Sequence, residues 1–293
     1  MWAMTFLPFL LTALIQGVTV GFIYSIVTVA FSMSWGISDI VNISVAYQTI
    51  LAAYVVYWCY VLWGVNVLLF LLILPPLMAL INFSINRFLL SRLIKQHVLN
   101  SLLVFFGISY ALEGLMGWQW SPIQRTLIAP YLEASYDIAG IFVSVSELIT
   151  LIVTLVIYSI LIIFLKKTRT GRSIRAVAQN KKGAYVVGIN VERIHLLIQA
   201  IAGAAAGVAG VLLAITYSFF PAVGAIWVGY LFLVVVLGSK GSVTGSLVGG
   251  AILGIIQAFI GFLLPQLWMS FVVFLILVVV LLIRPMGLLK GYV

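Results

Sequence analysis

The sequence predicts an all-α, polytopic helical membrane protein, with residues 1–293 forming one transmembrane domain. Hydrophobic residues make up 65% of the chain and charged residues only 7%, whereas soluble domains carry roughly 25% charged residues. Apolar runs such as 148–165 contain no charge at all, and a membrane-spanning helix needs about 20 apolar residues. The sequence does not show the alternating segments of about 10 residues that form the strands of an outer-membrane barrel.

Hydropathy predicts nine apolar helices along the chain. The seventh is short for a full crossing, so eight or nine membrane crossings are expected. The predicted ranges are 6–34, 46–63, 66–86, 98–118, 145–165, 194–217, 226–237, 244–263 and 267–283.

Basic residues predict the orientation of these helices. Of the 15 Lys and Arg residues, most follow the third and the fifth predicted helices, and cytoplasmic loops are enriched in these residues. We therefore expect these two segments and the C-terminus in the cytoplasm, and the 119–147 loop on the opposite side. The net charge of +9 then reflects topology and contact with membrane lipid, and no nucleic-acid partner is expected. The two clusters contain Arg87, Arg92 and Lys95, and then Lys166, Lys167, Arg169, Arg172, Arg175, Lys181, Lys182 and Arg193.

Two polar stretches interrupt the apolar helices, GISDIVNIS at 36–44 and GSKGSVTG at 238–245. Broken backbone at membrane depth is tolerated only where it is buried in protein or lines a wet cavity. Paired interruptions also indicate a transporter with an internal repeat. We predict that the breaks meet near a translocation pathway, with Lys240 at its cytoplasmic edge; the alternative is that both are buried structural corners. The predicted pathway residues are Asp39, Asn42, Ser44, Gly241, Ser242 and Gly245.

The basic segment at about 166–193 predicts one or two short helices on the cytoplasmic face. Ser173 is the expected N-cap, and Ile174, Val177 and Ala178 share one helical face. Gly183 and Gly188 are expected to end the two helices, and Asn190 to cap the next span. The alternative is a basic loop that sets topology and touches anionic lipid.

The stretch TGRSIRAVAQNKKGAYVVGINVERI within this segment resembles the cytoplasmic loop of ABC-importer permeases of the branched-chain amino acid type. The resemblance continues at Pro221 and Gly224 and at the second polar break. The matching residues are Thr170, Gly171, Arg175, Ala176, Ala178, Asn180, Ala184, Gly188, Ile189, Asn190 and Val191, and then Gly238, Gly241, Ser242, Gly245 and Gly249.

The N-terminal half matches this family less closely. The family often has I-N-F-A-H-G where residues 41–46 read VNISVA, so Asn42 is kept while Val45 and Ala46 replace the His and the Gly. Gln257 stands where the family often has Glu. The substrate therefore stays open between branched-chain amino acids and related small polar solutes.

The resemblance implies that the basic segment is a coupling segment, which docks in a cleft of a separate ATPase subunit. The chain has no G-x-x-x-x-G-K-[ST] motif, so ATP and Mg are expected on the partner ATPase subunits and no cofactor in this chain. The resemblance also implies a second permease subunit, an extracytoplasmic substrate-binding protein and a bacterial inner-membrane location. The predicted coupling residues are Gly171, Arg172, Arg175, Ala176, Ala178, Gln179, Asn180 and Gly188.

Two other classes of protein fit the sequence less well than an ABC permease. A stand-alone secondary transporter or channel usually carries ionisable groups in the membrane, and only Asp39 and Glu113 are available here. A membrane enzyme would need a cluster of acid, base or nucleophile at one depth, and the sequence shows none. Glycines four residues apart, such as Gly17 with Gly21 and Gly203 with Gly207, predict closely packed helices.

Overall fold

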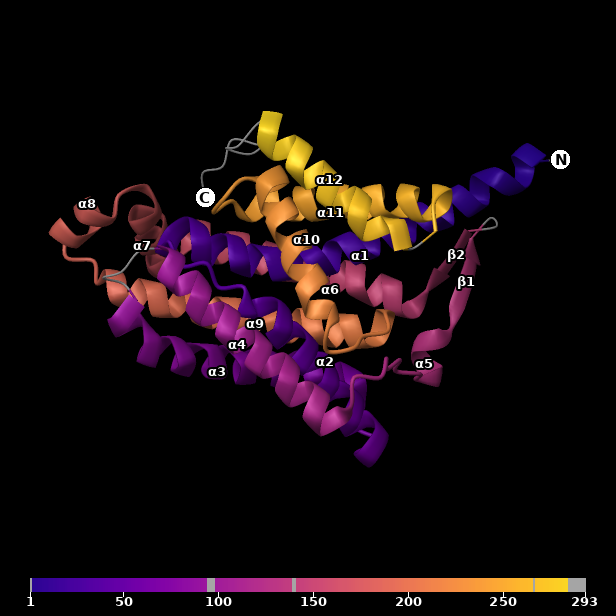
Figure 1. The fold of residues 1–293 in the computed structure, drawn as a ribbon, viewed down its shortest axis with the longest axis horizontal. Helices are drawn as coiled ribbons and strands as arrows, with labels where there is room; N and C mark the ends of the chain where they lie inside the picture. Colours follow the sequence, from indigo (N-terminus) through magenta and orange to yellow (C-terminus); the bar gives the residue numbers. More distant parts are fainter. Residues whose placement is uncertain (1, 94–97, 139–140, 266, 284–293) are drawn as a thin grey trace.

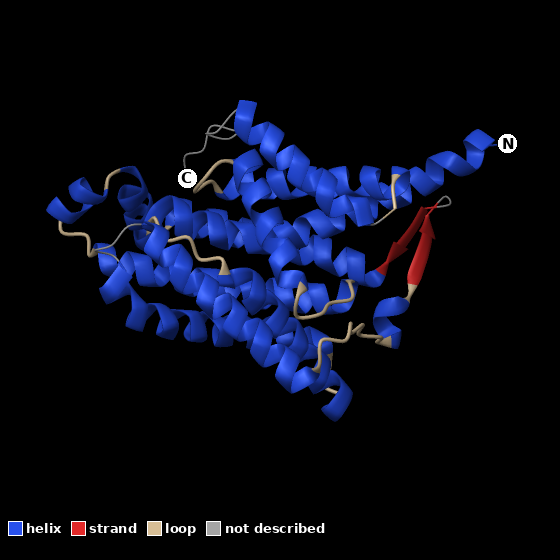
Figure 2. Cartoon of the chain, in the orientation of Figure 1, coloured by secondary structure: helices blue, strands red, loops and turns tan. Residues whose placement is uncertain are grey.

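The computed structural model describes residues 2–93, 98–138, 141–265 and 267–283. Lys95 and the C-terminal Arg284 and Lys290, which were used to predict orientation, lie outside these residues. Almost the whole described chain is helical, and one short hairpin is the exception (Figure 2). The elements are α1 (Trp2–Ser38), α2 (Ser44–Trp63), η1 (Val67–Leu69), α3 (Phe70–Leu93), α4 (Val98–Trp120), α5 (Pro130–Glu133), β1 (Ser135–Ile138), β2 (Ile141–Ser144), α6 (Val145–Lys167), α7 (Arg169–Gln179), α8 (Lys181–Val186), α9 (Val191–Thr216), α10 (Val223–Gly238), α11 (Val243–Leu263) and α12 (Leu267–Ile283).

All nine predicted apolar helices are present, which confirms the all-α membrane fold. Among the described residues, seven helices are long and apolar enough to cross a membrane, and α10 and α12 are shorter apolar helices. The predicted eight or nine crossings therefore correspond to seven full-length spans and two shorter helices. The first helix continues to Ser38, beyond the predicted end at 34, because the polar residues there bond within the bundle instead of ending the helix.

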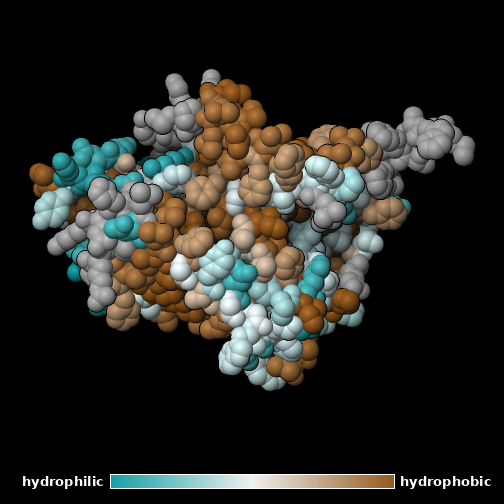
Figure 3. Space-filling view, in the orientation of Figure 1, coloured by the Kyte–Doolittle hydropathy of each residue, from teal (hydrophilic) through white to brown (hydrophobic). Residues whose placement is uncertain are grey.

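The long helices run along the long axis of the molecule, and α10 crosses them steeply (Figure 1). At one end lie α7 and α8, which carry many of the basic residues; we call this the basic end. At the other end lie α5 and the β1–β2 hairpin, and we call this the hairpin end. Hydrophobic residues dominate the surface between the two ends, and hydrophilic residues gather around α7 and α8 (Figure 3).

The hairpin is a departure from the sequence prediction, which treated 119–147 as a loop. Its strands pair antiparallel, with Ser135 opposite Ser144 and Ile138 opposite Ile141. Ser144 then starts α6 with a capping box: its Oγ accepts from the Glu147 backbone N–H at 3.3 Å, and the Glu147 carboxylate accepts from the Ser144 N–H at 2.9 Å. Such reciprocal bonds satisfy two backbone donors at a helix start.

Helices α1 and α9 are the most buried of the seven spans, and the others surround them. Glycines let these helices approach closely, as their spacing predicted. A Cβ added at Gly17 of α1 would lie 2.5 Å from the Cβ of Ala258 in α11, and one added at Gly207 of α9 would lie 2.8 Å from the carbonyl oxygen of Leu74 in α3. The helices around α1 and α9 are therefore tightly packed.

Candidate functional site

The basic segment folds as two capped helices, α7 and α8. Thr168 caps α7, with its Oγ1 accepting from the Gly171 N–H at 2.9 Å. Asn180 ends α7 and starts α8, and its Oδ1 accepts from the Gly183 N–H at 2.9 Å. One or two short helices were predicted here, and two are present.

Two of the predicted helix ends are wrong, and two are confirmed. Ser173 lies inside α7, where its hydroxyl donates to the Arg169 carbonyl, because the extended backbone that a cap requires occurs earlier, at Thr168. Gly183 lies inside α8 because α7 has already ended at Asn180, which also caps the start of α8. Gly188 follows α8 with a φ of +82°, and Asn190 caps α9 by accepting from the Arg193 N–H at 3.0 Å.

The predicted coupling residues divide into an inner and an outer group. Ile174 and Val177 are fully buried against the bundle, and Gly171 packs on α6, where an added Cβ would lie 2.5 Å from the Leu165 carbonyl oxygen. On the inner side with them, Arg175, Ala176 and Ala178 are partly buried, whereas Arg172, Gln179, Asn180 and Gly188 are exposed. The inner group holds α7 to the membrane helices, and the outer group is free to contact another molecule.

Sequence reasoning missed an exposed apolar tip on this segment, formed by Tyr185, Val186 and Val187. Their exposed fractions are 75%, 83% and 74%. The tip lies at the basic end, beyond the long spans, with hydrophilic surface around it (Figures 1 and 3). Three adjacent apolar residues inside a basic segment were visible in the sequence, but their exposure depends on which face of α8 packs inward.

The first break enters a buried network of amide side chains. Asn42 is fully buried, and its Nδ2 donates to the Oε1 of Gln199 in α9 at 2.9 Å. The Nε2 of Gln199 donates to the Ser34 hydroxyl of α1 at 2.6 Å. Ser44, also fully buried, donates its hydroxyl to the Oδ1 of Asn42 at 2.6 Å.

The same network continues into α2 and α3. Gln48 Nε2 donates to Ser44 at 3.1 Å and to the Oδ1 of Asn82 at 3.2 Å. Asn82 Nδ2 donates to the Gln199 backbone carbonyl at 2.7 Å, and Asn86 donates back to Asn82. Polar residues within apolar spans were a usable signal for this network, but only Asn42 and Ser44 were selected from the sequence.

The second break is built from closely approaching glycine backbones. Gly241 has a φ of +79°, a conformation that favours glycine, and Gly36 of α1 lies directly against it. Gly238 and Gly245 pack on one another across the turn. Ser242 caps α11, its Oγ accepting from the Gly245 N–H at 3.0 Å. The two breaks therefore meet, as the sequence predicted.

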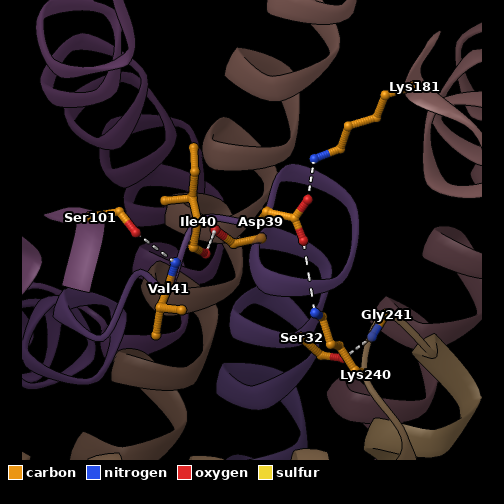
Figure 4. Close-up of polar contacts among 9 residues, drawn as sticks. Ser32, Asp39, Ile40, Val41, Ser101, Lys181, Lys240 and Gly241 are labelled. Atoms are coloured by element: carbon orange, nitrogen blue, oxygen red, sulfur yellow. Dashed lines mark hydrogen bonds and ion pairs between the residues drawn. The ribbon is translucent and has the colours of Figure 1, made fainter. Parts of the chain in front are cut away.

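The predicted pathway residues occupy two different environments. Asn42, Ser44, Gly241, Ser242 and Gly245 are all buried in this conformation. Asp39 is exposed at the basic end, where its carboxylate pairs with Lys181 and Lys240 (Figure 4). It does not cap α2, whose N-cap is Ile43 with no side-chain bond. A pathway role for these residues stays a prediction.

Two further polar sites lie in the spans. Glu113 of α4 is partly exposed, and its Oε2 is buried with no hydrogen-bond partner among the described residues. His195 of α9 is buried, and its Nδ1 lies 2.8 Å from the Ser38 hydroxyl at the end of α1. Because Ser38 belongs to the first break, His195 connects α9 to that break.

A cavity of about 470 Å³ opens at the hairpin end. None of the predicted pathway residues, all of which the structure describes, lines this cavity. Polar groups on its wall are contributed by the start of α6 and the end of α9. The polar lining residues are Thr126, Ser144, Ser146, Thr216 and Tyr217.

A bundle of long apolar helices, interrupted twice and carrying a folded basic segment at one end, is the architecture of a multi-pass helical membrane protein. The comparisons with known proteins give the particular family. A family model described as the permease component of a branched-chain amino acid transport system matches residues 13–282. The chain belongs to this family, and is therefore a non-catalytic transport subunit of the ABC permease type.

Several relatives match along nearly their whole length. The chain is 28% identical over 292 residues to the high-affinity branched-chain amino acid transport system permease protein BraD of Pseudomonas aeruginosa, covering 95% of each chain. It is 29% identical over 296 residues to the LivH permease protein of Salmonella typhimurium, covering 96% of each. A shorter match, 30% over 118 residues, covers 37% of this chain and 35% of the probable ABC transporter permease protein YphD of Escherichia coli. No solved structure matches the chain.

Family membership decides between the classes that the sequence left open. An ABC permease works within a transport system of several subunits, so a stand-alone secondary transporter or channel is not supported. The resemblance read from the basic segment and the second break is confirmed by a match that spans both halves of the chain.

Proposed function

We propose that this chain is the membrane-spanning permease subunit of an ABC importer for branched-chain amino acids or related small polar solutes. The family and the full-length relatives support this substrate class. In this proposal ATP and Mg bind separate ATPase subunits, a second permease subunit completes the pathway, and an extracytoplasmic binding protein delivers substrate. The basic end faces the cytoplasm, consistent with the enrichment of Lys and Arg there.

The observation that carries the coupling role is the exposed tip of Tyr185, Val186 and Val187 on a folded segment outside the spans. Apolar side chains exposed this far are typical anchors for a protein partner, because their burial in a pocket is favourable. Basic residues around the tip suit a polar rim. We therefore assign the tip to the docking surface for the ATPase subunit, together with the exposed Arg172 and Gln179 of α7.

The docking assignment is tested with Val186→Asp in the complex of both permease subunits and the ATPases. A charge in the docking pocket should lower ATPase co-purification and substrate-stimulated hydrolysis by about tenfold or more, as for an interface hot spot. Ile123→Asp, at a 62% exposed residue of the hairpin end, is the matched control and should retain both. Normal ATPase binding together with weaker binding to anionic vesicles would instead assign the tip to lipid.

For the inner residues of α7, we expect uptake to be lost while the ATPase still binds. Arg175→Glu and Ala178→Trp are expected to uncouple ATP hydrolysis from uptake. Because Ala178 packs partly against the bundle, its replacement should act by moving α7 on the membrane helices and not by blocking the ATPase. Retained ATPase binding with lost uptake would agree with this expectation, and normal uptake would contradict it.

The substrate is tested by uptake into proteoliposomes that contain the complete system. Radiolabelled leucine should accumulate only with ATP and the binding protein, and unlabelled isoleucine and valine should compete. Competition by a different class of small polar solute, with none by these amino acids, would change the substrate assignment and keep the permease assignment.

The pathway residues at the breaks are part of the same proposal. All of them except Asp39 are buried in this conformation, so substrate passage would require the two breaks to move apart. Asn42 and Ser44 carry the polar groups that a zwitterionic solute needs in place of water, because an unpaired polar group in an apolar medium costs roughly 2–7 kcal/mol.

A further inference from the structure

Three charged side chains from three separate segments meet at the basic end (Figure 4). Asp39 follows α1 at the first break, and its Oδ2 lies 2.5 Å from the Nζ of Lys181 at the start of α8. Its Oδ1 lies 3.8 Å from the Nζ of Lys240 in the second break. A single carboxylate thus contacts the α7–α8 segment and joins both helix breaks.

The backbone around Asp39 holds this carboxylate in place. Asp39 has a φ of +57°, a left-handed conformation that is uncommon for a residue other than glycine. On its C-terminal side, the Ile40 carbonyl accepts from the Ser34 hydroxyl at 2.9 Å, and the Val41 N–H donates to the Ser101 hydroxyl at 3.4 Å. These bonds fix the first break to α1 and α4, so a movement of Asp39 also moves the chain at the break.

Lys240 is positioned in a similar way from the second break. Its Nζ lies 5.2 Å from the centre of the Trp35 ring of α1, within the range of a cation–π contact. The N–H of the next residue, Gly241, donates to the Ser32 hydroxyl at 2.9 Å. The second break is therefore tied to the last turns of α1, close to the residue that binds α8.

Folding stability does not account for this arrangement. The Asp39 side chain is 51% exposed and the Lys181 side chain 38%, and ion pairs this exposed contribute little to stability. An unfavourable backbone conformation combined with a weak ion pair is instead typical of a site whose geometry matters for function.

We propose that Asp39 is a positioning residue that transmits movement of the α7–α8 segment to both helix breaks. This rests on the proposed function, in which that segment docks on an ATPase subunit. When the ATPase moves α8, the Lys181 ammonium draws the Asp39 carboxylate and the first break with it. Lys240 follows because its ammonium group is attracted to the same carboxylate, 3.8 Å away.

The test measures solute taken up per ATP hydrolysed, in proteoliposomes containing the complete transport system. Asp39→Asn and Lys181→Gln should each lower this ratio by about fivefold, the low end of typical coupling between sites. The double variant should be no worse than the more affected single variant, because both act through one contact. ATPase co-purification and the melting temperature should stay at the parent values.

Two further variants separate this role from a general effect of charge. Lys181→Arg keeps the positive charge and should keep the ratio. Arg87→Gln removes an exposed arginine of α3, outside the coupling segment, which forms no ion pair in the described part of the chain, and should also keep it. If the Asp39→Asn protein does not assemble into the transport complex, the uptake-to-hydrolysis ratios of Lys181→Gln and Lys181→Arg test the proposal by themselves.

The inference is overturned if the ratio is unchanged in Asp39→Asn and Lys181→Gln, if Arg87→Gln loses as much, or if the single losses multiply in the double variant. Failure of the proposed function has a different signature. The unmodified complex would then show no substrate-stimulated hydrolysis and no uptake, and both proposals would be rejected together.

Discussion

At the first break, between α1 and α2, the chain leaves the helix among buried amides, whereas at the second break, between α10 and α11, it turns on glycines. Asn42 and Ser44 bond to side chains of α2 and α9. At the second break Gly238 and Gly245 bring two backbones into contact, with no side chain between them. Side-chain hydrogen bonds therefore hold the first break, whereas the second depends on close backbone contact, which is possible because its glycines have no side chains.

Because of this difference, we expect opposite kinds of substitution to destabilise the two breaks. A buried amide network loses stability when one member is removed, because its partners stay buried and unpaired. A glycine contact loses stability when any side chain is added, because the facing backbone has no room to yield. Each break then has its own sensitive substitution and its own control.

The largest effect is expected for Gly245→Leu at the second break. An added Cβ would overlap the Gly238 carbonyl, and forcing extra atoms into a well-packed core costs about 1–3 kcal/mol or more. Because a backbone carbonyl is the obstacle here, we expect little folded protein and no uptake. Thermal unfolding in detergent measures this.

The control for that substitution is Gly107→Leu in α4, where an added Cβ meets no atom within 4 Å. Its melting temperature should stay near that of the parent protein. A Gly245→Leu protein that melts normally but has lost uptake would contradict the packed corner and would favour a pathway role for Gly245.

A smaller loss is expected for Gln199→Leu, which tests the first break. Leucine fills a similar volume but leaves the Asn42 amide without its acceptor, while the Ser34 hydroxyl loses one bond and keeps its bond to the Ile40 carbonyl. An unsatisfied buried group costs about 1–3 kcal/mol, so the free energy of unfolding should fall by about this amount. Thr154→Val is the control, since the buried Thr154 hydroxyl has no partner among the described residues, and it should be neutral. Equal stability of the two variants would show that the network does not hold the first break.

The smallest effects are expected where a single hydroxyl ties a break to a neighbouring helix. Ser32→Ala leaves the buried Gly241 N–H without its acceptor at 2.9 Å and should cost about 1 kcal/mol. Ser101→Ala should cost less, because its bond to the Val41 N–H is 3.4 Å long and long hydrogen bonds are weak. Chemical unfolding of both variants gives the order, and the reverse order would contradict a tighter tie at the second break.

Local composition accounts for the features that were predicted correctly. The nine apolar helices, the two polar breaks and the basic segment each differ from their surroundings in hydropathy over several residues. Helix ends were less certain, because a cap depends on one residue's backbone. Thr168 rather than Ser173 starts α7 for this reason, and Asn180 rather than Gly183 separates α7 from α8.

The sequence by itself determined that this chain crosses the membrane repeatedly, that two breaks interrupt its helices and that a basic segment projects from one end. Only the tertiary structure decided which polar groups meet. Asn42 and Gln199 are 157 residues apart and Asp39 and Lys181 are 142 apart, so their pairing depends on how α1, α8 and α9 pack. The same holds for the exposure of Tyr185, Val186 and Val187, because an apolar residue is buried or exposed according to the face of its helix that meets the bundle.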